Sequence, residues 1–196
     1  MKTLKQVWYD LMSEVLTFGV IVEDYYEKLG INVQFGFDDI DELLLDERIK
    51  ADTLEMEKVF FSNEANIFNH SYSKTILTPY PSNNSPIDAI CKLLKNNISS
   101  RKAVLIFAPY GEEKVPCITS IQFVVRQNVL YVFYTSRSQD IYRKFPCDAI
   151  CIASYAKQVA QKLNLGLGHI CANIVSPHIY IENKTEAIQY LDSNKI

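Results

Sequence analysis

Val115-Pro116-Cys117-Ile118-Thr119-Ser120-Ile121-Gln122-Phe123 is the stretch that decides the fold, because it places a cysteine at the start of a β-rich run. Residues 118–126 and 129–136 both have the composition of strands, and only Gln127-Asn128 separates them, which predicts a tight hairpin. Arg137-Ser138-Gln139-Asp140 follows the second strand. A hairpin brings the start of its first strand beside the end of its second, so we expect Cys117 and Arg137 to be neighbours.

The chain before this hairpin contains two patterns of helices and strands. Apolar residues recur at helical spacing over residues 3–18 and Gly19 follows as a stop, which predicts an amphipathic helix. A strand is expected at 31–37, one or two helices within 38–68, and a further strand at 103–108. Residues 78–86 have the composition of a loop, and the loop passes into a helix with Ser85 as its N-cap and Pro86 at its first position.

The chain after the hairpin begins with a long apolar helix. Residues 148–164 alternate apolar side chains at a 3.6-residue period and carry few charges, which predicts a helix buried on most sides. Gly166-Leu167-Gly168 is expected to break it, and short apolar runs follow at 170–175 and 178–181 before a terminal helix capped by Asn183 and Glu186. We therefore predict an α+β fold in a single domain, residues 1–196, with a mixed β-sheet packed against a long buried helix.

Composition excludes several classes of protein. Hydrophobic residues make up 48% of the 196 residues and charged residues 22%, as in soluble globular proteins. The net charge of −3 gives no basic surface for nucleic acid, although a mononucleotide needs only two or three cations. The N-terminus runs directly into an amphipathic pattern and no stretch is long enough to span a bilayer, so we expect a cytoplasmic protein without a membrane partner.

The five cysteines are odd in number and irregularly spaced, without a CxxC pair. This pattern predicts free thiols and neither a disulfide framework nor a metal site. Cys117 differs from the others because a thiol beside a guanidinium is more acidic, and the thiolate is a strong nucleophile. The alternative is that Cys117, like most strand cysteines, is a small core residue.

The order of short motifs around Cys117 resembles the thymidylate synthase signature. Pro-Cys, Gln-Phe, Arg-Ser-x-Asp, a buried helix and His-x-Tyr follow one another from Cys117 to Tyr180 without a gap. The resemblance implies a thymidylate synthase-like fold, in which Cys117 attacks a pyrimidine 5′-monophosphate. It implies that Gln122 belongs to the substrate site, that Arg137 and Ser138 bind the phosphate, that His178 and Tyr180 bond the sugar hydroxyl, and that Asp140 lies near the pterin of the folate.

Upstream segments resemble the same family with gaps. Arg101 and Lys102, before the strand at 103–108, resemble the basic pair that reaches across the family's dimer to the partner's phosphate, which implies a homodimer. Tyr72, in Asn69-His70-Ser71-Tyr72, resembles a tyrosine near the nucleophile. Glu57, before Phe60-Phe61, resembles the catalytic glutamate, and its alternative interpretation is a solvated helix face.

Asp148 stands where a synthase acting on dUMP carries an asparagine. A carboxamide complements the N3–H and O4 of uracil, whereas a carboxyl protonated on one oxygen complements the N3 and exocyclic amine of cytosine. Within the superfamily this exchange marks the dCMP and CMP hydroxymethylases. The resemblance therefore implies hydroxymethylation of CMP or dCMP with 5,10-methylenetetrahydrofolate, ended by water rather than hydride. The alternative is that Asp148 only caps the following helix.

Other positions depart from the family pattern. Residues 19–30 contain no Arg-Thr-Gly loop, Lys144 replaces a glycine under the folate, and Ile118 replaces the histidine after the cysteine. Only residues 181–196 follow Tyr180, so we expect the tail that closes over the folate to be missing. Two further hypotheses stay open: a divergent thymidylate synthase that methylates dUMP, and a nucleotide-binding or scaffold protein that has lost the folate half of the site.

Overall fold

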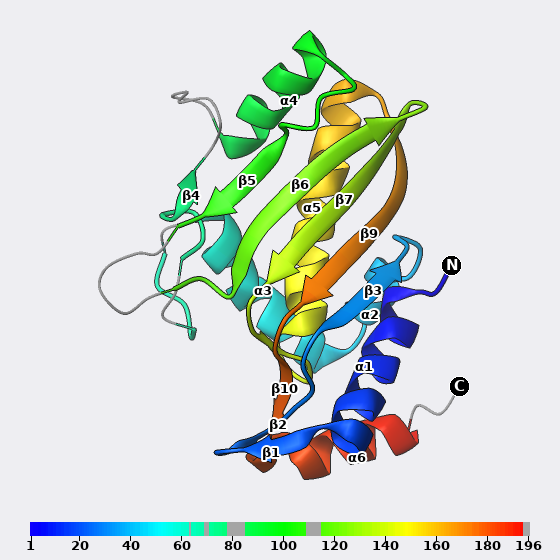
Figure 1. The fold of residues 1–196 in the computed structure, drawn as a ribbon, viewed down its shortest axis with the longest axis vertical. Coiled ribbons are helices and arrows are strands. Elements are labelled where there is room, and N and C mark those ends of the chain that lie inside the picture. Colours follow the sequence, from blue (N-terminus) through cyan, green and yellow to red (C-terminus); the bar gives the residue numbers. More distant parts are fainter. Residues whose placement is uncertain (63, 69–70, 78–84, 109–114, 194–196) are drawn as a thin grey trace.

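A computed structural model of the chain describes residues 1–62, 64–68, 71–77, 85–108 and 115–193. Its largest unit is a six-stranded sheet in the order β3-β9-β7-β6-β5-β4 (Figure 1). The bounds of these strands are Ile31–Phe35, Gly166–Ile174, Val129–Ser136, Ile118–Arg126, Val104–Phe107 and Ile76–Leu77. Only the β7–β9 pair is parallel and the others are antiparallel, so the predicted mixed sheet is confirmed.

A second sheet continues from one end of the first. Its order is β1-β2-β10-β8, with bounds Val20–Val22, Tyr25–Glu27, Pro177–Tyr180 and Gln139–Asp140. β8 and β10 pair in parallel, which sets His178 opposite Asp140. β8 follows β7 along the chain and β10 follows β9. The parallel pairing of β7 with β9 in the first sheet therefore continues as the parallel pairing of β8 with β10 in the second sheet.

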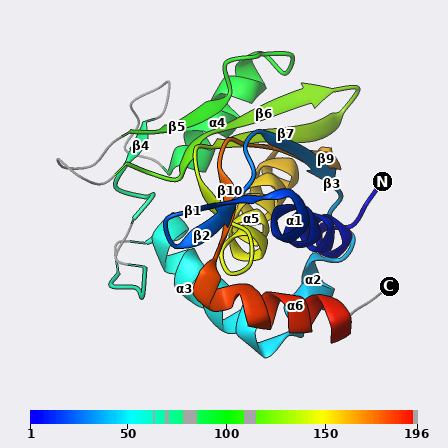
Figure 2. The same ribbon diagram turned by 60° about the horizontal axis from the view of Figure 1, so that its bottom comes forward.

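Helix α5 (Phe145–Leu163) fills the centre of the molecule, as predicted. It lies against one face of the six-stranded sheet, and α3 (Glu47–Phe61) and α1 (Leu4–Phe18) enclose its other sides (Figure 2). Ala149, Ile152, Ala153 and Ala156 are fully buried along it. The helix begins three residues earlier than expected because Pro146 is tolerated in a first turn, where its missing N–H would have had no helical partner.

The remaining helices cover the edges. α4 (Pro86–Asn96) packs on α5, and Ser85 caps it by accepting a hydrogen bond from Asp88 N at 3.2 Å, as predicted; residues 78–84 of the predicted loop lie outside the described residues. The region 38–68 contains the short α2 (Ile40–Leu43) and α3. After a 3₁₀ turn at Ile181–Asn183, α6 (Lys184–Ser193) packs on α1.

The β6–β7 hairpin has the predicted two-residue turn. Gln127 and Asn128 have φ values of 50° and 63°, the positive signs that a type I′ turn requires at both central positions. At the other end of the hairpin a register shift between Ile118 and Ser120 marks a β-bulge. The bulge lies directly after Cys117 and changes the direction in which the chain enters the sheet.

The expected break at Gly166-Leu167-Gly168 is wrong. Helix α5 ends earlier, at Leu163, with Asn164 in the left-handed conformation, and β9 already begins at Gly166. A Cβ on Gly168 would lie 2.5 Å from the ring of Tyr131 on the neighbouring strand β7. Gly168 is therefore explained by close packing under an aromatic ring and not by a turn. Across the residues that the structure describes, no helix is both long enough and apolar enough to span a bilayer.

Candidate active site

Cys117 and Arg137 lie side by side at the open end of the β6–β7 hairpin. Arg137 N donates to the carbonyl oxygen of Cys117 at 2.8 Å, and the guanidinium donates from Nε to Pro116 O at 3.0 Å and from Nη2 to Val115 O at 2.6 Å. The same Nη2 is 4.0 Å from Cys117 Sγ. The predicted proximity of the thiol and the guanidinium is confirmed, and backbone pairing fixes it.

The expected acidity of Cys117 is wrong for the chain without substrate. Burial raises the pKa of the Cys117 thiol above its ordinary value, and the Asp148 and Asp140 carboxyls raise it further. Arg137 and Lys144 act in the opposite direction without reversing the shift. The free-energy cost of removing the thiolate from water exceeds the stabilisation of the thiolate by the neighbouring cations. Cys117 is therefore a protonated thiol at neutral pH.

Tyr72 lies beside Cys117. Its hydroxyl oxygen accepts a hydrogen bond from Ile118 N, the amide that follows Cys117, at 3.2 Å. Its ring packs against Phe60 and Phe107, with centroids 4.7 Å and 5.1 Å away. Burial, followed by the charges of Asp148 and Cys117, raises the pKa of Tyr72 well above 10, so the group is a neutral phenol. Asn69 and His70, quoted with it, lie outside the described residues.

Asp148 is a buried carboxyl in the first turn of α5. Gln139 Nε2 on β8 donates to Asp148 Oδ2 at 2.6 Å, whereas Asp148 Oδ1 and Gln139 Oε1 have no hydrogen-bond partner among the described residues. Burial raises the pKa of Asp148 to about 7, against smaller lowering effects from Gln139 and Lys144. The capping alternative is wrong, because the N-cap of α5 is Lys144 and the Asp148 side chain bonds to Gln139.

Ser138, His178 and Tyr180 gather on the second sheet, next to the end of β7. Ser138 Oγ lies 3.5 Å from His178 Nδ1, which is also 3.1 Å from the carbonyl oxygen of Ser176. The His178 ring contacts the rings of Tyr180 and Tyr25, each at 5.2 Å between centroids. The parallel pairing of β8 with β10 thus brings the Arg-Ser segment and the His-x-Tyr segment together.

Asp140 and Lys144 form a short turn between β8 and α5. Asp140 Oδ1 accepts hydrogen bonds from the backbone amides of Tyr142 and Arg143, each at 3.1 Å, and burial raises its pKa. Lys144 Nζ lies 4.8 Å from the centre of the Phe68 ring, and its charge lowers the pKa of both Cys117 and Asp148. Sequence reasoning identified Lys144 only as a departure and missed that it is a cation of the site.

Three residues predicted for the site do not join this cluster within one chain. Gln122, on β6, donates from Nε2 to the carbonyl oxygen of Arg101 at 2.9 Å. This hydrogen bond ties the Gln122 side chain to the segment before β5. The β5–β6 register pairs Val104 with Gln122, and continuing it back to Arg101 reaches Val125, which is roughly 26 Å along β6 from Cys117 at about 3.3 Å per residue. Arg101 and Lys102 are exposed there.

Glu57 is also separate from the cluster. Its side chain is exposed on α3, whereas Met56 and Phe60 of that helix face the core. The exposure of Glu57 agrees with the alternative interpretation, in which Glu57 is part of a solvated helix face. We therefore leave Glu57 out of the proposed machinery.

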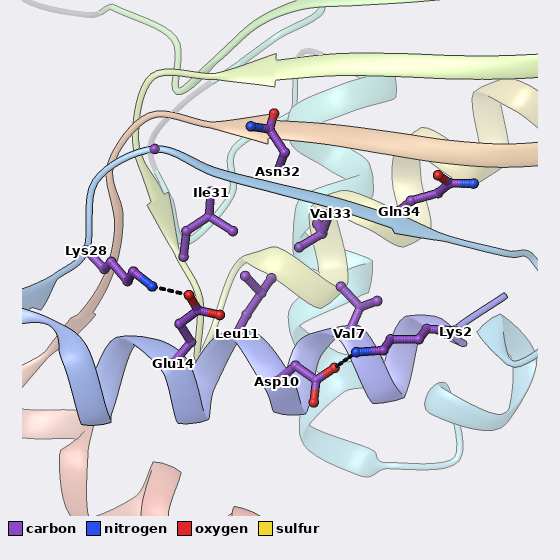
Figure 3. Close-up of a pocket in the computed structure, with 11 residues that line it drawn as sticks. Lys2, Val7, Asp10, Leu11, Glu14, Lys28, Ile31, Asn32, Val33 and Gln34 are labelled. Carbon is purple, nitrogen blue, oxygen red and sulfur yellow. Dashed lines mark hydrogen bonds and ion pairs between the residues drawn. The ribbon is translucent and has the colours of Figure 1, made fainter.

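A hollow of about 430 Å³ lies elsewhere, between α1 and β3 (Figure 3). Lys28 pairs with Glu14 and Lys2 with Asp10 along it, so the cations that could attract a phosphate are already neutralised. Among the described residues, no cluster of three or more His, Cys, Asp or Glu side chains is arranged to hold a metal ion. Neither feature competes with the surroundings of Cys117 as a candidate active site.

Comparison with known proteins points to one family. The family model for thymidylate synthase matches residues 47–195. Proteins described as "Putative thymidylate synthase" are 32% identical over 105 residues in Methanothermobacter thermautotrophicus and 27% identical over 146 residues in Methanocaldococcus jannaschii. These matches cover 52% and 69% of this chain, and 47% and 66% of the relatives. The chain thus matches between about half and two thirds of the length of these relatives.

A solved structure confirms the predicted type of fold. The thermostable thymidylate synthase A from Bacillus subtilis superposes with a TM-score of 0.71 over 97% of this chain and 84% of the other. The sequences are 15% identical, so the likeness shows the fold alone.

Asp148 should make stability depend on pH. Its pKa is about 7 in the folded chain against an ordinary 3.8, so the folded state holds the proton more tightly. The cost of burying the charge is absent below about pH 4 and complete above about pH 7. Asp148→Asn removes this cost and keeps an acceptor for Gln139. We expect the variant to gain up to about 4 kcal/mol relative to the parent between these limits, at about 1.4 kcal/mol per pKa unit.

Urea unfolding of both proteins near pH 5 and pH 8 measures this gain. The informative quantity is how the difference in free energy of unfolding between variant and parent changes from about pH 5 to about pH 8. An unfavourable contact of the introduced asparagine amide would lower the stability of the variant equally at both pH values and would not affect this change. A difference that is equal at the two pH values contradicts the assignment of Asp148 as the buried titrating group.

Arg137 should control the reactivity of Cys117. Arg137→Gln removes the main influence that lowers the pKa of the thiol, so alkylation of Cys117 by iodoacetamide near pH 8 should slow several-fold. Arg137→Lys keeps the charge and should retain most of the rate. Cys171, on β9, is an internal reference whose pKa is shifted by burial alone, and its rate should not change. Equal rates at Cys117 in the parent and the glutamine variant would show that the guanidinium does not act on the thiol.

Proposed function

This chain belongs to the thymidylate synthase family, and from that premise we propose that it transfers a one-carbon unit to carbon 5 of a pyrimidine nucleoside 5′-monophosphate. We propose a cytosine nucleotide, CMP or dCMP, as the substrate and its 5-hydroxymethyl derivative as the product. The observation that carries this choice is Asp148, a fully buried carboxyl with a pKa of about 7 and one oxygen without a partner among the described residues.

The protonation of Asp148 makes recognition of cytosine possible. A carboxylate only accepts hydrogen bonds, whereas a neutral carboxyl offers one donor and one acceptor. Cytosine presents an N3 acceptor beside an amine donor, which a neutral carboxyl complements. Burial raises the pKa of Asp148 to about 7, which keeps the needed proton available near neutral pH, and bonding to N3 favours that form further.

Cys117 supplies the covalent step. Its sulfur bonds to carbon 6 as the thiol proton leaves to solvent, which makes carbon 5 electron-rich. When bound, methylenetetrahydrofolate would supply the one-carbon unit to carbon 5 and would leave as tetrahydrofolate when its carbon–nitrogen bond breaks. Loss of the carbon 5 proton, addition of water to the exocyclic carbon and breakage of the bond between Sγ and carbon 6 would then give the 5-hydroxymethyl product and restore the ring and the thiol. Tyr72, bonded to the amide after Cys117, holds the segment that carries the sulfur.

The groups around Cys117 suit a nucleotide. In this proposal Arg137 and Ser138, at the end of β7, bind the phosphate, and His178 and Tyr180 bond a sugar hydroxyl. A guanidinium pairs with phosphate through two parallel N–H bonds, which fixes orientation as well as charge. Holding the phosphate and the sugar keeps carbon 6 near Cys117 Sγ, and this positioning lowers the entropy cost of addition.

5,10-Methylenetetrahydrofolate would supply the one-carbon unit when bound. Asp140 fits a pterin, because a buried carboxyl held by two backbone amides can accept hydrogen bonds from ring N–H groups. Lys144 makes this part of the site bulkier and more positive than the glycine of the family pattern. We propose Asp140 as the residue that contacts the pterin.

We also propose a homodimer in the cytoplasm, with each chain folded as one domain over residues 1–196. Ile106, Phe133 and Leu167 are exposed apolar residues on three strands of the six-stranded sheet. A second copy would cover them. Because Arg101 is far from Cys117 of its own chain, it serves the partner's phosphate site in this proposal.

Release of tritium from carbon 5 tests the activity. The purified chain is incubated with CMP, dCMP or dUMP labelled at carbon 5, with and without methylenetetrahydrofolate, and tritiated water is measured. We expect folate-dependent release from a cytosine nucleotide, since carbon 5 exchanges its hydrogen for the one-carbon unit. Cys117→Ser should abolish release, whereas Cys91→Ser should keep it because Cys91 is a buried residue of α4, away from the site.

The other outcomes each favour another function. Release from dUMP alone makes the chain a thymidylate synthase that methylates uracil. If nucleotides bind without any release, the chain is a nucleotide-binding protein that has lost the folate half of the site.

Mixing two inactive variants tests the shared site. A chain with Cys117→Ser and a chain with Arg101→Ala each lack one part, but a mixed dimer contains one site with both. Random exchange should recover about a quarter of the parent activity, because half of the dimers are mixed and each has one good site. Mixed dimers that form without any recovery would show that Arg101 does not serve the partner.

A further inference from the structure

The Gln139–Asp148 pair carries two buried polar atoms that the fold leaves without hydrogen bonds. Gln139 is 2% exposed and Asp148 is 1% exposed, and the single bond between them joins Nε2 to Oδ2 at 2.6 Å. Gln139 Oε1 and Asp148 Oδ1 have no partner among the described residues. Buried polar atoms without partners cost about 1–3 kcal/mol each. Two such atoms on adjacent side chains indicate a place that a polar ligand completes.

A neutral carboxyl alone cannot distinguish cytosine from uracil by position. Its proton can sit on either oxygen, so it can offer donor and acceptor in either order. In the orientation that its amide has in the structure, Gln139 removes this ambiguity. Because Nε2 donates to Oδ2, that oxygen must act as an acceptor, and the proton must sit on Oδ1.

We propose that Gln139 is a second base-reading residue, which fixes the proton of Asp148 on Oδ1 facing N3 of cytosine and accepts the exocyclic amine with its free Oε1. This inference rests on the proposed function and names a specificity-determining residue of the same site. Uracil meets two mismatches, because Oδ1–H faces the N3–H donor and Oε1 faces the O4 acceptor. Two opposed pairs in a buried site give strong discrimination, because the groups are left unpaired away from water.

Several titratable groups face Asp148 and set its protonation together with Gln139. The Lys144 cation on α5 favours the carboxylate, and Asp140 on β8 favours the neutral form. The other groups within electrostatic reach are themselves held neutral by burial: Tyr72 before β4, Tyr134 on β7, Cys117 before β6, and Cys147 and Cys151 on α5. Tyr134 has a hydroxyl without a partner among the described residues, so the unsatisfied region extends from β8 toward β7.

Binding of CMP, dCMP and dUMP by Gln139→Met, measured by calorimetry between about pH 5.5 and pH 8.5, tests the inference. Methionine has a similar length without polar atoms. We expect the affinity for cytosine nucleotides to fall at least about tenfold at low pH, as for one lost buried hydrogen bond, and dUMP binding to change much less. The pH above which cytosine-nucleotide binding declines, near 7 for the parent, should move upward because the donor that favoured the carboxylate is gone. Gln34→Met makes the same chemical change on an exposed residue of β3 and should leave both readouts unchanged.

The outcomes separate this inference from the proposed function. If the parent prefers cytosine nucleotides and the variant keeps both the preference and the pH midpoint, Gln139 is only a structural neighbour and the inference is overturned alone. An equal loss of affinity for all three nucleotides, with an unchanged midpoint, has the same meaning. If the parent itself prefers dUMP, the proposed substrate and the inference fail together.

Discussion

The register of the β6–β7 hairpin determines where the chemistry lies. Ile118 pairs with Ser136, and Arg137 N donates to Cys117 O, so the sulfur and the guanidinium occupy positions set by backbone hydrogen bonds. A slip of one residue would turn the side chains of a strand to the opposite face and separate the two groups. The two-residue turn at Gln127-Asn128 prevents this, because its positive φ values suit one connection between the strands.

Burial of α5 is the second constraint, and it disfavours charge in the interior of the site. Asp148, Tyr72 and Cys117 all have raised pKa values for the same reason, which is the loss of water around their charged forms. The cations Arg137 and Lys144 stay partly accessible at the rim. An uncharged interior with cations at its edge suits a ligand that has an uncharged base and an anionic phosphate. In the proposed function, the base offsets the unfavourable burial of Asp148 by completing its hydrogen bonding.

Local pattern predicted most of the fold, and tertiary packing decided the rest. The strands 118–126 and 129–136 have the expected bounds, because alternation and turn composition are local signals. Local pattern does not explain Gly168, because the side chain that excludes a Cβ there is the Tyr131 ring on another strand. The pKa of Cys117 could not be predicted, since spacing reveals Arg137 but not the burial that outweighs it. Gln139 occupies the variable position of Arg-Ser-x-Asp, and its role depends on a contact with α5 that no spacing reveals.

In the proposed function, specificity therefore belongs to the Gln139–Asp148 pair and not to either residue. In the observed arrangement Nε2 faces Oδ2, and the pair presents a donor at Oδ1 and an acceptor at Oε1. Turning the amide over and moving the proton to Oδ2 would present an acceptor at Oδ1 and a donor at Nε2, which complements uracil. The two arrangements contain the same atoms and the same internal hydrogen bond in reverse. What separates them is the surroundings, which include the Lys144 charge, the Tyr134 hydroxyl and Asp140. An Asp in place of Asn thus makes cytosine readable, and the neighbours that orient its proton decide whether cytosine is preferred.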